Sequence, residues 1–127
     1  TNQSGIGRGY HTIEDTLRVN ARMESLLGLP SPIFDEVCIA PEGPGEPAAY
    51  RKPSPRFIRE TIERLGLEAS ACWMVGDGPS DIGSALAAGI RAAAVRTGRT
   101  DPASYPEVAE HRVPVFDDFR AFASTLH

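Results

Sequence analysis

The sequence predicts an α/β fold in which helices flank a mainly parallel sheet, as in a three-layer Rossmann-like domain. Three observations predict it. Segments with helical and strand periodicity alternate along the chain, the strand segments are short and apolar, and glycine or proline separates them. The chain has 127 residues, which lies within the usual size of one domain, so we expect residues 1–127 to form a single domain.

The first expected elements are a helix and a strand. Thr12 and Asp15 have the spacing of a capping box. Apolar residues then recur at four-residue spacing, namely Ile13, Leu17 and Ala21. This pattern predicts a helix over 13–27 that ends at Gly28. The apolar and β-branched run 33–39 predicts a short strand.

The remaining elements follow the same alternation after a proline-rich loop over 40–55. We expect a helix that ends at Gly66, a strand over 72–75, a helix from Pro79 to Gly89, a strand over 92–95, a loop over 97–106, a strand over 113–116 and a helix over 117–126. The continuous apolar run at 72–75 is typical of a strand that is covered on both faces.

Composition limits the classes of partner. The net charge is −4 and the acidic and basic residues form no long runs, so we expect neither a nucleic-acid surface nor a polybasic membrane patch. No apolar stretch reaches the roughly 20 residues of a membrane span. The two cysteines are far apart and the histidines, His11, His111 and His127, are scattered. We expect a cytoplasmic protein in which these histidines have structural or surface positions.

Two carboxylates follow the strand expected at 72–75. Gly76 lets the backbone turn sharply before Asp77, and Asp81 lies one helical turn further on, where it can face the same site. Carboxylates at a strand end could hold a hard cation. The alternative is structural, because an aspartate often begins a turn and is also favoured in the first turn of a helix.

Two further segments could bind phosphate. Arg51 and Lys52 precede a rigid Pro-Ser-Pro sequence at the start of an expected helix. The segment 1–9 combines hydroxyl and amide groups with three alternate glycines, whose backbone N–H groups could approach an oxyanion. Each segment also has a structural interpretation, a solvated basic pair for the first and a flexible surface turn for the second.

Together, the three segments resemble motifs two, three and four of the haloacid dehalogenase (HAD) phosphatases, and within them the heptose bisphosphate and histidinol phosphate phosphatases. The residues that carry the resemblance are Thr-Asn-Gln-Ser-Gly-Ile-Gly-Arg-Gly at 1–9, Arg-Lys-Pro at 51–53 and Val-Gly-Asp with a later Asp at 75–81. The resemblance extends from Thr1 to about Gly98. It implies a HAD-like sheet and magnesium-dependent hydrolysis of a small phosphorylated metabolite, such as a sugar phosphate or bisphosphate.

The resemblance also implies a role for each matching residue. Thr1 would donate its hydroxyl to the transferring phosphoryl group, and Lys52 would neutralise the charge of that group. Asp77 would ligate Mg²⁺, and Asp81 would steady Lys52 or a metal-bound water. The substrate-binding residues would be Asn2 and Arg51.

Two departures from the family pattern qualify these expectations. The motif Asp-x-Asp, which supplies the aspartyl-phosphate nucleophile, has no counterpart in this chain. We therefore expect its strand to precede residue 1 in a protein of about 170–190 residues, typical of one domain, and the 127-residue chain alone to be inactive. Many relatives bind zinc in the long loop, but Ala40, Ala48 and Tyr50 replace three of the four ligands, so we expect no zinc.

A second interpretation belongs to another class of protein. The chain could be a catalytically inactive phosphate-binding or scaffold protein that begins near Thr1 and retains a remnant site. The DNA sequence upstream of the Thr1 codon distinguishes the two interpretations. An in-frame segment that encodes a strand ending in Asp-x-Asp supports the enzyme. The sequence leaves the substrate, the oligomeric state and the conformation of the loop 40–50 open.

Overall fold

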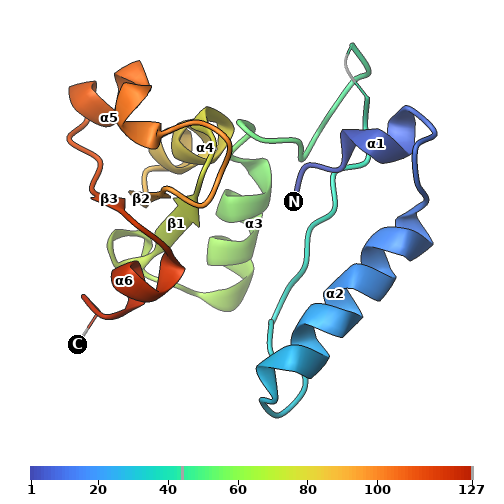
Figure 1. Cartoon of the computed structure of the whole chain (residues 1–127). Coiled ribbons are helices and arrows are strands. Elements are labelled where there is room, and N and C mark those ends of the chain that lie inside the picture. The colour runs from blue at the N-terminus through green and yellow to red at the C-terminus, as the bar shows by residue number, and fades with distance from the viewer. Residues whose placement is uncertain (44, 127) are drawn as a thin grey trace. The chain divides into compact units, whose positions relative to one another are not determined.

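The computed structural model describes residues 1–43 and 45–126. Pro44, in the proline-rich loop, and His127 therefore lie outside the described residues. The chain forms two compact units, Thr1–Arg51 and Lys52–His127 (Figure 1).

The second unit contains the parallel sheet that the sequence predicts. Its three strands are β1 (Trp73–Gly76), β2 (Arg91–Val95) and β3 (Val115–Phe116), in the order β1-β2-β3. Val75 of β1 lies opposite Ala93 of β2, and Ala94 of β2 lies opposite Val115 of β3. Because all three strands are parallel, their carboxyl ends meet at one edge of the sheet.

Helices connect these strands. The helices of the unit are α3 (Arg56–Leu65), η1 (Ala69–Ala71), α4 (Pro79–Ala88), η2 (Pro102–Ser104), α5 (Pro106–Glu110) and α6 (Phe119–Ala123). Gly66 and Gly89 end α3 and α4 in the left-handed conformation, with φ of 62° and 78°, as glycine favours. The short helix η2 lies within the predicted loop 97–106, and α5 follows it where no element was predicted. The strand predicted near 113–116 is present as β3, and α6 is shorter than the helix expected over 117–126.

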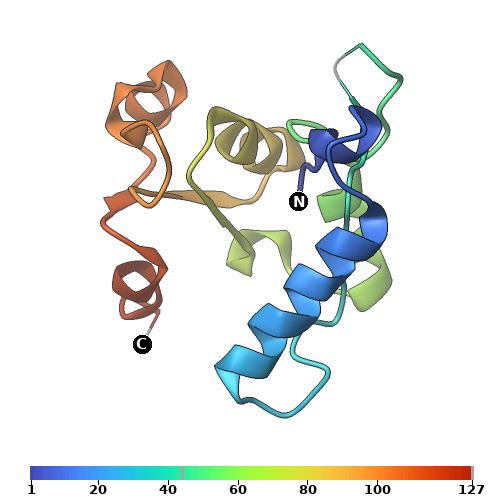
Figure 2. The ribbon, with the colours of Figure 1, turned by 45° about the vertical axis from the view of Figure 1, so that its right-hand side comes forward.

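The core lies between α4 and the sheet. Ile82 and Ala85 of α4 pack with Ala92 and Ala94 of β2, and all four are almost completely buried. The alternate residues of β2 face the other side, where α6 places the buried Phe122. Figures 1 and 2 show α4 and α6 on opposite sides of the strands. The unit therefore has the three-layer α/β architecture that the sequence predicts.

The strand β1 differs from its expectation. A strand covered on both faces was expected, but all four residues of β1 are only half-buried, whereas four of the five residues of β2 are buried. The reason is position, because β1 is at the edge of the described sheet and β2 is in its centre. Trp73 packs edge-on against Phe122, with 5.3 Å between ring centroids, and the Arg91 guanidinium lies over its ring.

The first unit contains α1 (Ser4–Gly7) and α2 (Ile13–Leu27). The capping box at the start of α2 is present, since the Asp15 carboxylate accepts the Thr12 N–H at 2.8 Å and the Thr12 hydroxyl accepts the Asp15 N–H at 3.2 Å. The Thr12 backbone hydrogen bond, followed by the bond from its hydroxyl, lowers the pKa of Asp15 below its usual value of 3.8. The predicted helix is confirmed with its bounds.

The strand expected over 33–39 is wrong. The structure assigns only an isolated parallel bridge between Asn2 and Ala40. Hydrogen bonds from the Gln3 N–H to Ala40 O and from the Ala40 N–H to Thr1 O hold this bridge. Among the described residues, no further pairing extends this bridge along 33–39, and a strand requires such a ladder of hydrogen bonds.

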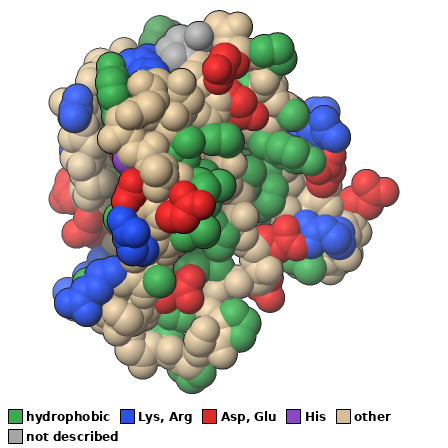
Figure 3. Space-filling view, turned by 90° about the vertical axis from the view of Figure 1, so that its right-hand side faces the viewer, with side chains coloured by type: hydrophobic (Ala, Val, Ile, Leu, Met, Phe, Trp, Pro, Cys, Tyr) green, Lys and Arg blue, Asp and Glu red, His purple; other side chains and the backbone are tan. Residues whose placement is uncertain are grey.

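Many large apolar side chains of the first unit are exposed. They are Tyr10, Ile13, Leu17, Val19, Met23, Leu26, Leu27, Leu29, Phe34 and Val37. Figure 3 shows hydrophobic side chains open to solvent between charged ones. Among the described helices, none has both the length and the apolar character needed to cross a bilayer.

Candidate active site

The candidate site lies at the carboxyl end of β1, where the chain turns from the strand into α4. Asp77 directly follows β1, and Asp81 is in the first turn of α4. Ligands of open parallel sheets gather at this edge, because the loops that leave the strands converge there.

Asp81 is held by its neighbours and is 7% exposed. One carboxylate oxygen, Oδ2, accepts the Gly78 N–H at 3.0 Å, and the other, Oδ1, forms an ion pair with Lys52 Nζ. A side chain at Gly76 would collide with the Asp81 carboxylate, so glycine is required there for this close approach. The arrangement fixes a carboxylate and an ammonium group, separated by 29 positions in sequence, at the same edge.

Asp77 is exposed, in contrast to Asp81. Its main-chain carbonyl accepts the Tyr105 hydroxyl at 3.2 Å. A Cβ atom at Gly98 would lie 2.8 Å from both Cβ and Cγ of Asp77, which is closer than side chains tolerate, so the loop after β2 passes directly against this aspartate. In the described part of the chain, no hydrogen bond or ion pair engages the Asp77 carboxylate, which leaves it open to a ligand.

The donor set fits magnesium in part. Mg²⁺ is usually held by one or two carboxylates together with water and the phosphate oxygens of a substrate. Asp77 supplies one such carboxylate. Within residues 1–43 and 45–126, no cluster of three or more His, Cys, Asp or Glu side chains could enclose a metal. The site is therefore suited to a metal that shares its ligands with water and substrate.

Thr1 and Asn2 belong to the first unit. The Thr1 amino group donates to Cys38 O at 2.6 Å, and its hydroxyl accepts Gln3 Nε2 at 3.1 Å. Asn2 forms the bridge to Ala40. The structure therefore places both residues beside the 38–40 segment, and their expected roles in phosphoryl transfer stay predictions.

Much of the backbone of the glycine-rich segment 1–9 is engaged in internal contacts, and its expected phosphate binding stays a prediction. Its N–H groups at Gln3, Ile6, Gly7, Arg8 and Gly9 donate to carbonyls of the same unit. The glycines have packing roles. A Cβ atom at Gly5 would lie 2.7 Å from His11 Nδ1, a Cβ atom at Gly7 would lie 2.6 Å from Gly43 N, and Gly9 has a φ of 74°. Internal contacts thus explain the glycine pattern.

Arg51 and Lys52, adjacent in sequence, have different partners. The Arg51 guanidinium donates to Glu42 O within the first unit, whereas Lys52 pairs with Asp81 in the second. Of the six residues predicted for the site, the structure brings together Lys52, Asp77 and Asp81.

Two residues near Asp77, Gly98 and Tyr105, were missed from the sequence. Neither matches a motif, and both lie in the stretch that was predicted to be a plain loop. The available signal was Gly98, three residues after the end of β2, since glycine is common where the backbone is approached closely. The Tyr105 contact depends on tertiary structure, and no sequence pattern indicates it.

A cavity of about 280 Å³ lies at the other edge of the sheet. It is lined by residues at the amino ends of the strands, including Trp73, Arg91 and Arg112. We place the site at the carboxyl edge instead, because the partly buried Lys52–Asp81 ion pair and the open carboxylate of Asp77 are there.

Comparison with known proteins identifies the family of the chain. The model of the HAD-hydrolase-like family matches residues 49–122. The D-glycero-beta-D-manno-heptose-1,7-bisphosphate 7-phosphatase of Pseudomonas putida is 33% identical over 126 residues, which cover 99% of this chain and 71% of that protein. The enzyme of the same name from Neisseria meningitidis serogroup A is also 33% identical, over 99% of this chain and 68% of that protein.

A solved structure is also similar. The D,D-heptose 1,7-bisphosphate phosphatase of B. bronchiseptica, complexed with magnesium and phosphate, has a TM-score of 0.83 and 28% identity, over 99% of this chain and 70% of that chain. These matches confirm the resemblance that the three sequence segments indicate. The chain belongs to the HAD superfamily of phosphatases, close to the heptose bisphosphate phosphatases.

Proposed function

We propose that the protein hydrolyses one phosphate ester of a sugar bisphosphate in a magnesium-dependent reaction. The observation that carries the proposal is the Lys52–Asp81 ion pair beside the open Asp77 carboxylate, all at the carboxyl end of β1. A fixed cation and a free metal ligand are the groups that phosphoryl transfer requires. The relatives named as heptose-1,7-bisphosphate 7-phosphatases support a sugar bisphosphate as the substrate class.

Each residue has a distinct task in this proposal. Asp77 would hold Mg²⁺, which when bound neutralises charge on the phosphoryl oxygens. Lys52 donates hydrogen bonds to those oxygens, and Asp81 keeps the ammonium group in position. The Thr1 hydroxyl donates to the same phosphoryl group, while Asn2 and Arg51 contact the rest of the substrate.

The proposal includes the aspartyl-phosphate intermediate that the family resemblance implies, formed on an aspartate that precedes residue 1, and no zinc. It also places the protein in the cytoplasm, where a chain whose two cysteines, Cys38 and Cys72, form no disulfide with each other is expected.

The test uses the complete open reading frame that encodes this chain. We expect it to release phosphate from heptose 1,7-bisphosphate in the presence of Mg²⁺ and to lose this activity on chelation. Asp77→Asn and Lys52→Met should each lower kcat/KM by about 10²-fold or more. The control is Glu63→Gln, since Glu63 is an exposed carboxylate on α3 and its loss should leave activity intact.

Two results would contradict the proposal. Activity that survives both chelation and Asp77→Asn would exclude the metal role. A folded full-length protein that binds phosphate esters without hydrolysing them would instead support the phosphate-binding or scaffold interpretation.

A further inference from the structure

The cavity of about 280 Å³ at the amino ends of the strands has a lining of two kinds. Apolar side chains form one part of it, among them Trp73 and Val113. Basic side chains form the other part, namely Arg91, His111 and Arg112. None of the described residues that line the cavity is acidic. Small-molecule sites commonly combine an apolar wall with a few polar groups, so this lining fits an anion that carries an apolar group.

The positive charge of this cavity is not neutralised within the described chain. Among residues 1–43 and 45–126, no hydrogen bond or ion pair engages the side chain of Arg91, His111 or Arg112. The Arg91 guanidinium instead lies over the Trp73 ring, 5.3 Å from the ring centroid. This cation–π contact orients the guanidinium at the cavity wall and leaves its charge available to a ligand.

Arg112 has an unusual backbone conformation. Its φ is 53°, and in the described part of the chain it is the only residue other than glycine with a positive φ. The Arg112 N–H donates to Ala109 O at 3.4 Å, and the Val113 N–H donates to Val108 O at 2.9 Å. These two hydrogen bonds form a Schellman motif at the end of α5, in which glycine usually occupies the left-handed position.

Three other helices do have glycine at this position. The helices α2, α3 and α4 end at Gly28, Gly66 and Gly89, whose φ angles are 63°, 62° and 78°. An arginine at the end of α5 is strained, because its Cβ atom disfavours the left-handed conformation. Strained residues cluster at functional sites, where the strain is offset by the role of the side chain. The side chain of Arg112 lines the cavity, which gives it such a role.

We propose that this cavity binds a small anion that carries an apolar ring, at a site separate from the proposed active site. Arg91 and Arg112 donate hydrogen bonds to the carboxylate or phosphate group of the ligand, and its ring packs against Trp73. A guanidinium binds either anionic group through two parallel hydrogen bonds. Pockets for drug-sized ligands measure roughly 300–1,000 Å³, so a cavity of about 280 Å³ suits a ligand with a single ring.

A solvated basic surface is the alternative interpretation, and it makes a different prediction. Solvated arginines attract every anion weakly and do not distinguish anions by their apolar part. A site with both kinds of lining requires both the charge and the ring. The comparison of ligands that lack one of the two features therefore separates the interpretations.

The experiment follows the fluorescence of Trp73, the only tryptophan of the 127 residues, while the full-length protein is titrated with three compounds. Phenylacetate has the ring and the charge, phenylacetamide has the ring without the charge, and acetate has the charge without the ring. Carboxylates are used because a phosphate ester would also bind at the proposed active site. We expect phenylacetate to bind at least about 10-fold more tightly than either other compound, as for the loss of a charged hydrogen bond. Equal affinity for phenylacetate and phenylacetamide, or no saturable change with phenylacetate, would overturn the inference.

Arg112→Gly removes a guanidinium and relieves the strained backbone at the same time. We expect Kd for phenylacetate to rise by about 10-fold or more, while the urea midpoint does not fall, because glycine adopts a positive φ without strain. Loss of binding then cannot be attributed to unfolding. Arg91→Gln should weaken binding by a similar factor without altering the end of α5. A Kd that is unchanged in both variants would overturn the inference.

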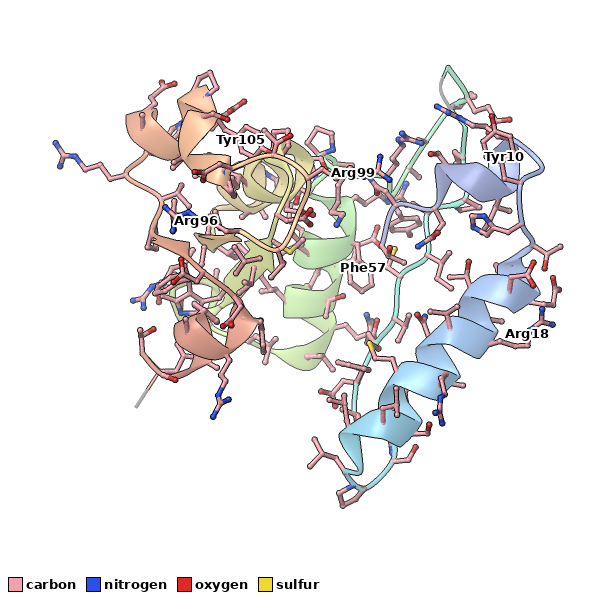
Figure 4. All side chains as sticks on the ribbon, in the orientation of Figure 1. Tyr10, Arg18, Phe57, Arg96, Arg99 and Tyr105 are labelled. Carbon is pink, nitrogen blue, oxygen red and sulfur yellow. The ribbon has the colours of Figure 1, made fainter. Side chains whose placement is uncertain are left out.

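The matched control is Arg99→Gln. Arg99 is an exposed arginine like Arg91, but it lies on the loop beyond the carboxyl end of β2, whereas Arg91 begins that strand (Figure 4). Its replacement should leave Kd for phenylacetate unchanged. Lys52→Met, which disables the proposed active site, should leave Kd unchanged as well. Loss of phenylacetate binding in Lys52→Met, with retention in Arg112→Gly, would place the anion at the active site and refute the inference.

Discussion

Replacing Gly98 by alanine tests the position of the proposed metal ligand. The added Cβ atom would collide with Asp77 Oδ2 and would lie 2.8 Å from Asp77 Cγ, whereas ordinary contact begins at 3.4 Å. The carboxylate must therefore withdraw by about 0.6 Å or more. Misplacement by about 1 Å in an active site can cost 10²-fold in rate, so we expect kcat/KM to fall by roughly 10- to 100-fold. Because Asp77 is exposed, the fold should tolerate the shift at a cost of about 1 kcal/mol.

The matched variant is Gly76→Ala, which places the same methyl group against Asp81. Asp81 is buried and bonded through both carboxylate oxygens, so it has no free direction in which to move. We expect this variant to lose about 3 kcal/mol of unfolding free energy, clearly more than Gly98→Ala. Urea denaturation, phosphatase assays and Mg²⁺ titration distinguish the two. Undiminished Mg²⁺ affinity and activity in Gly98→Ala would refute the reasoning that the Asp77 carboxylate is a ligand at this place.

Three further predictions concern stability. Ile82→Ala should lower the unfolding free energy by about 2–5 kcal/mol, because Ile82 is 1% exposed; a loss in urea denaturation no larger than that of exposed Leu65→Ala would contradict this packing. A double-mutant cycle of Lys52→Met and Asp81→Asn should give a coupling energy of about 1 kcal/mol or more, and additive effects would argue against a working ion pair. Hydrogen bonds at the start of α2 lower the pKa of Asp15. Its ionised form therefore stabilises the helix above pH 3.8, and this stabilisation is lost as the pH falls below that value. Amide exchange in α2 should show this pH dependence, and Asp15→Asn should weaken it; an unchanged profile would contradict it.

The second unit could be predicted well because its signals are local. Gly66 and Gly89 end helices in the left-handed conformation that glycine favours, and β2 is an apolar run whose burial follows from its central position. The strand expected at 33–39 is wrong because a strand needs a partner along its length, and periodicity does not report which residues of a segment find one. The apolar run at 33–39 satisfied the pattern, but only Ala40 beyond it entered a bridge.

The site could be predicted in part for the same reason. Asp77 and Asp81 are close in sequence, and their meeting at the carboxyl end of β1 follows from a strand–turn–helix pattern. The contacts of Gly98 and Tyr105 with Asp77 depend on how the loop after β2 returns over the sheet. In segment 1–9, ligand binding and internal packing favour the same residue, glycine, so the composition could not distinguish them.

The small side chains between α4 and β2 restrict how the protein can change during evolution. Ala85 and Ala94 are each 0% exposed, so the helix rests on the strand through methyl groups with little spare volume. A larger residue at Ala94 would displace α4, and Asp81 at the start of that helix would move with it. Substitutions in this layer are remote from any substrate, but they should disturb the Lys52–Asp81 pair. These positions should therefore accept substitutions more slowly during evolution than the small, apolar character of alanine alone suggests.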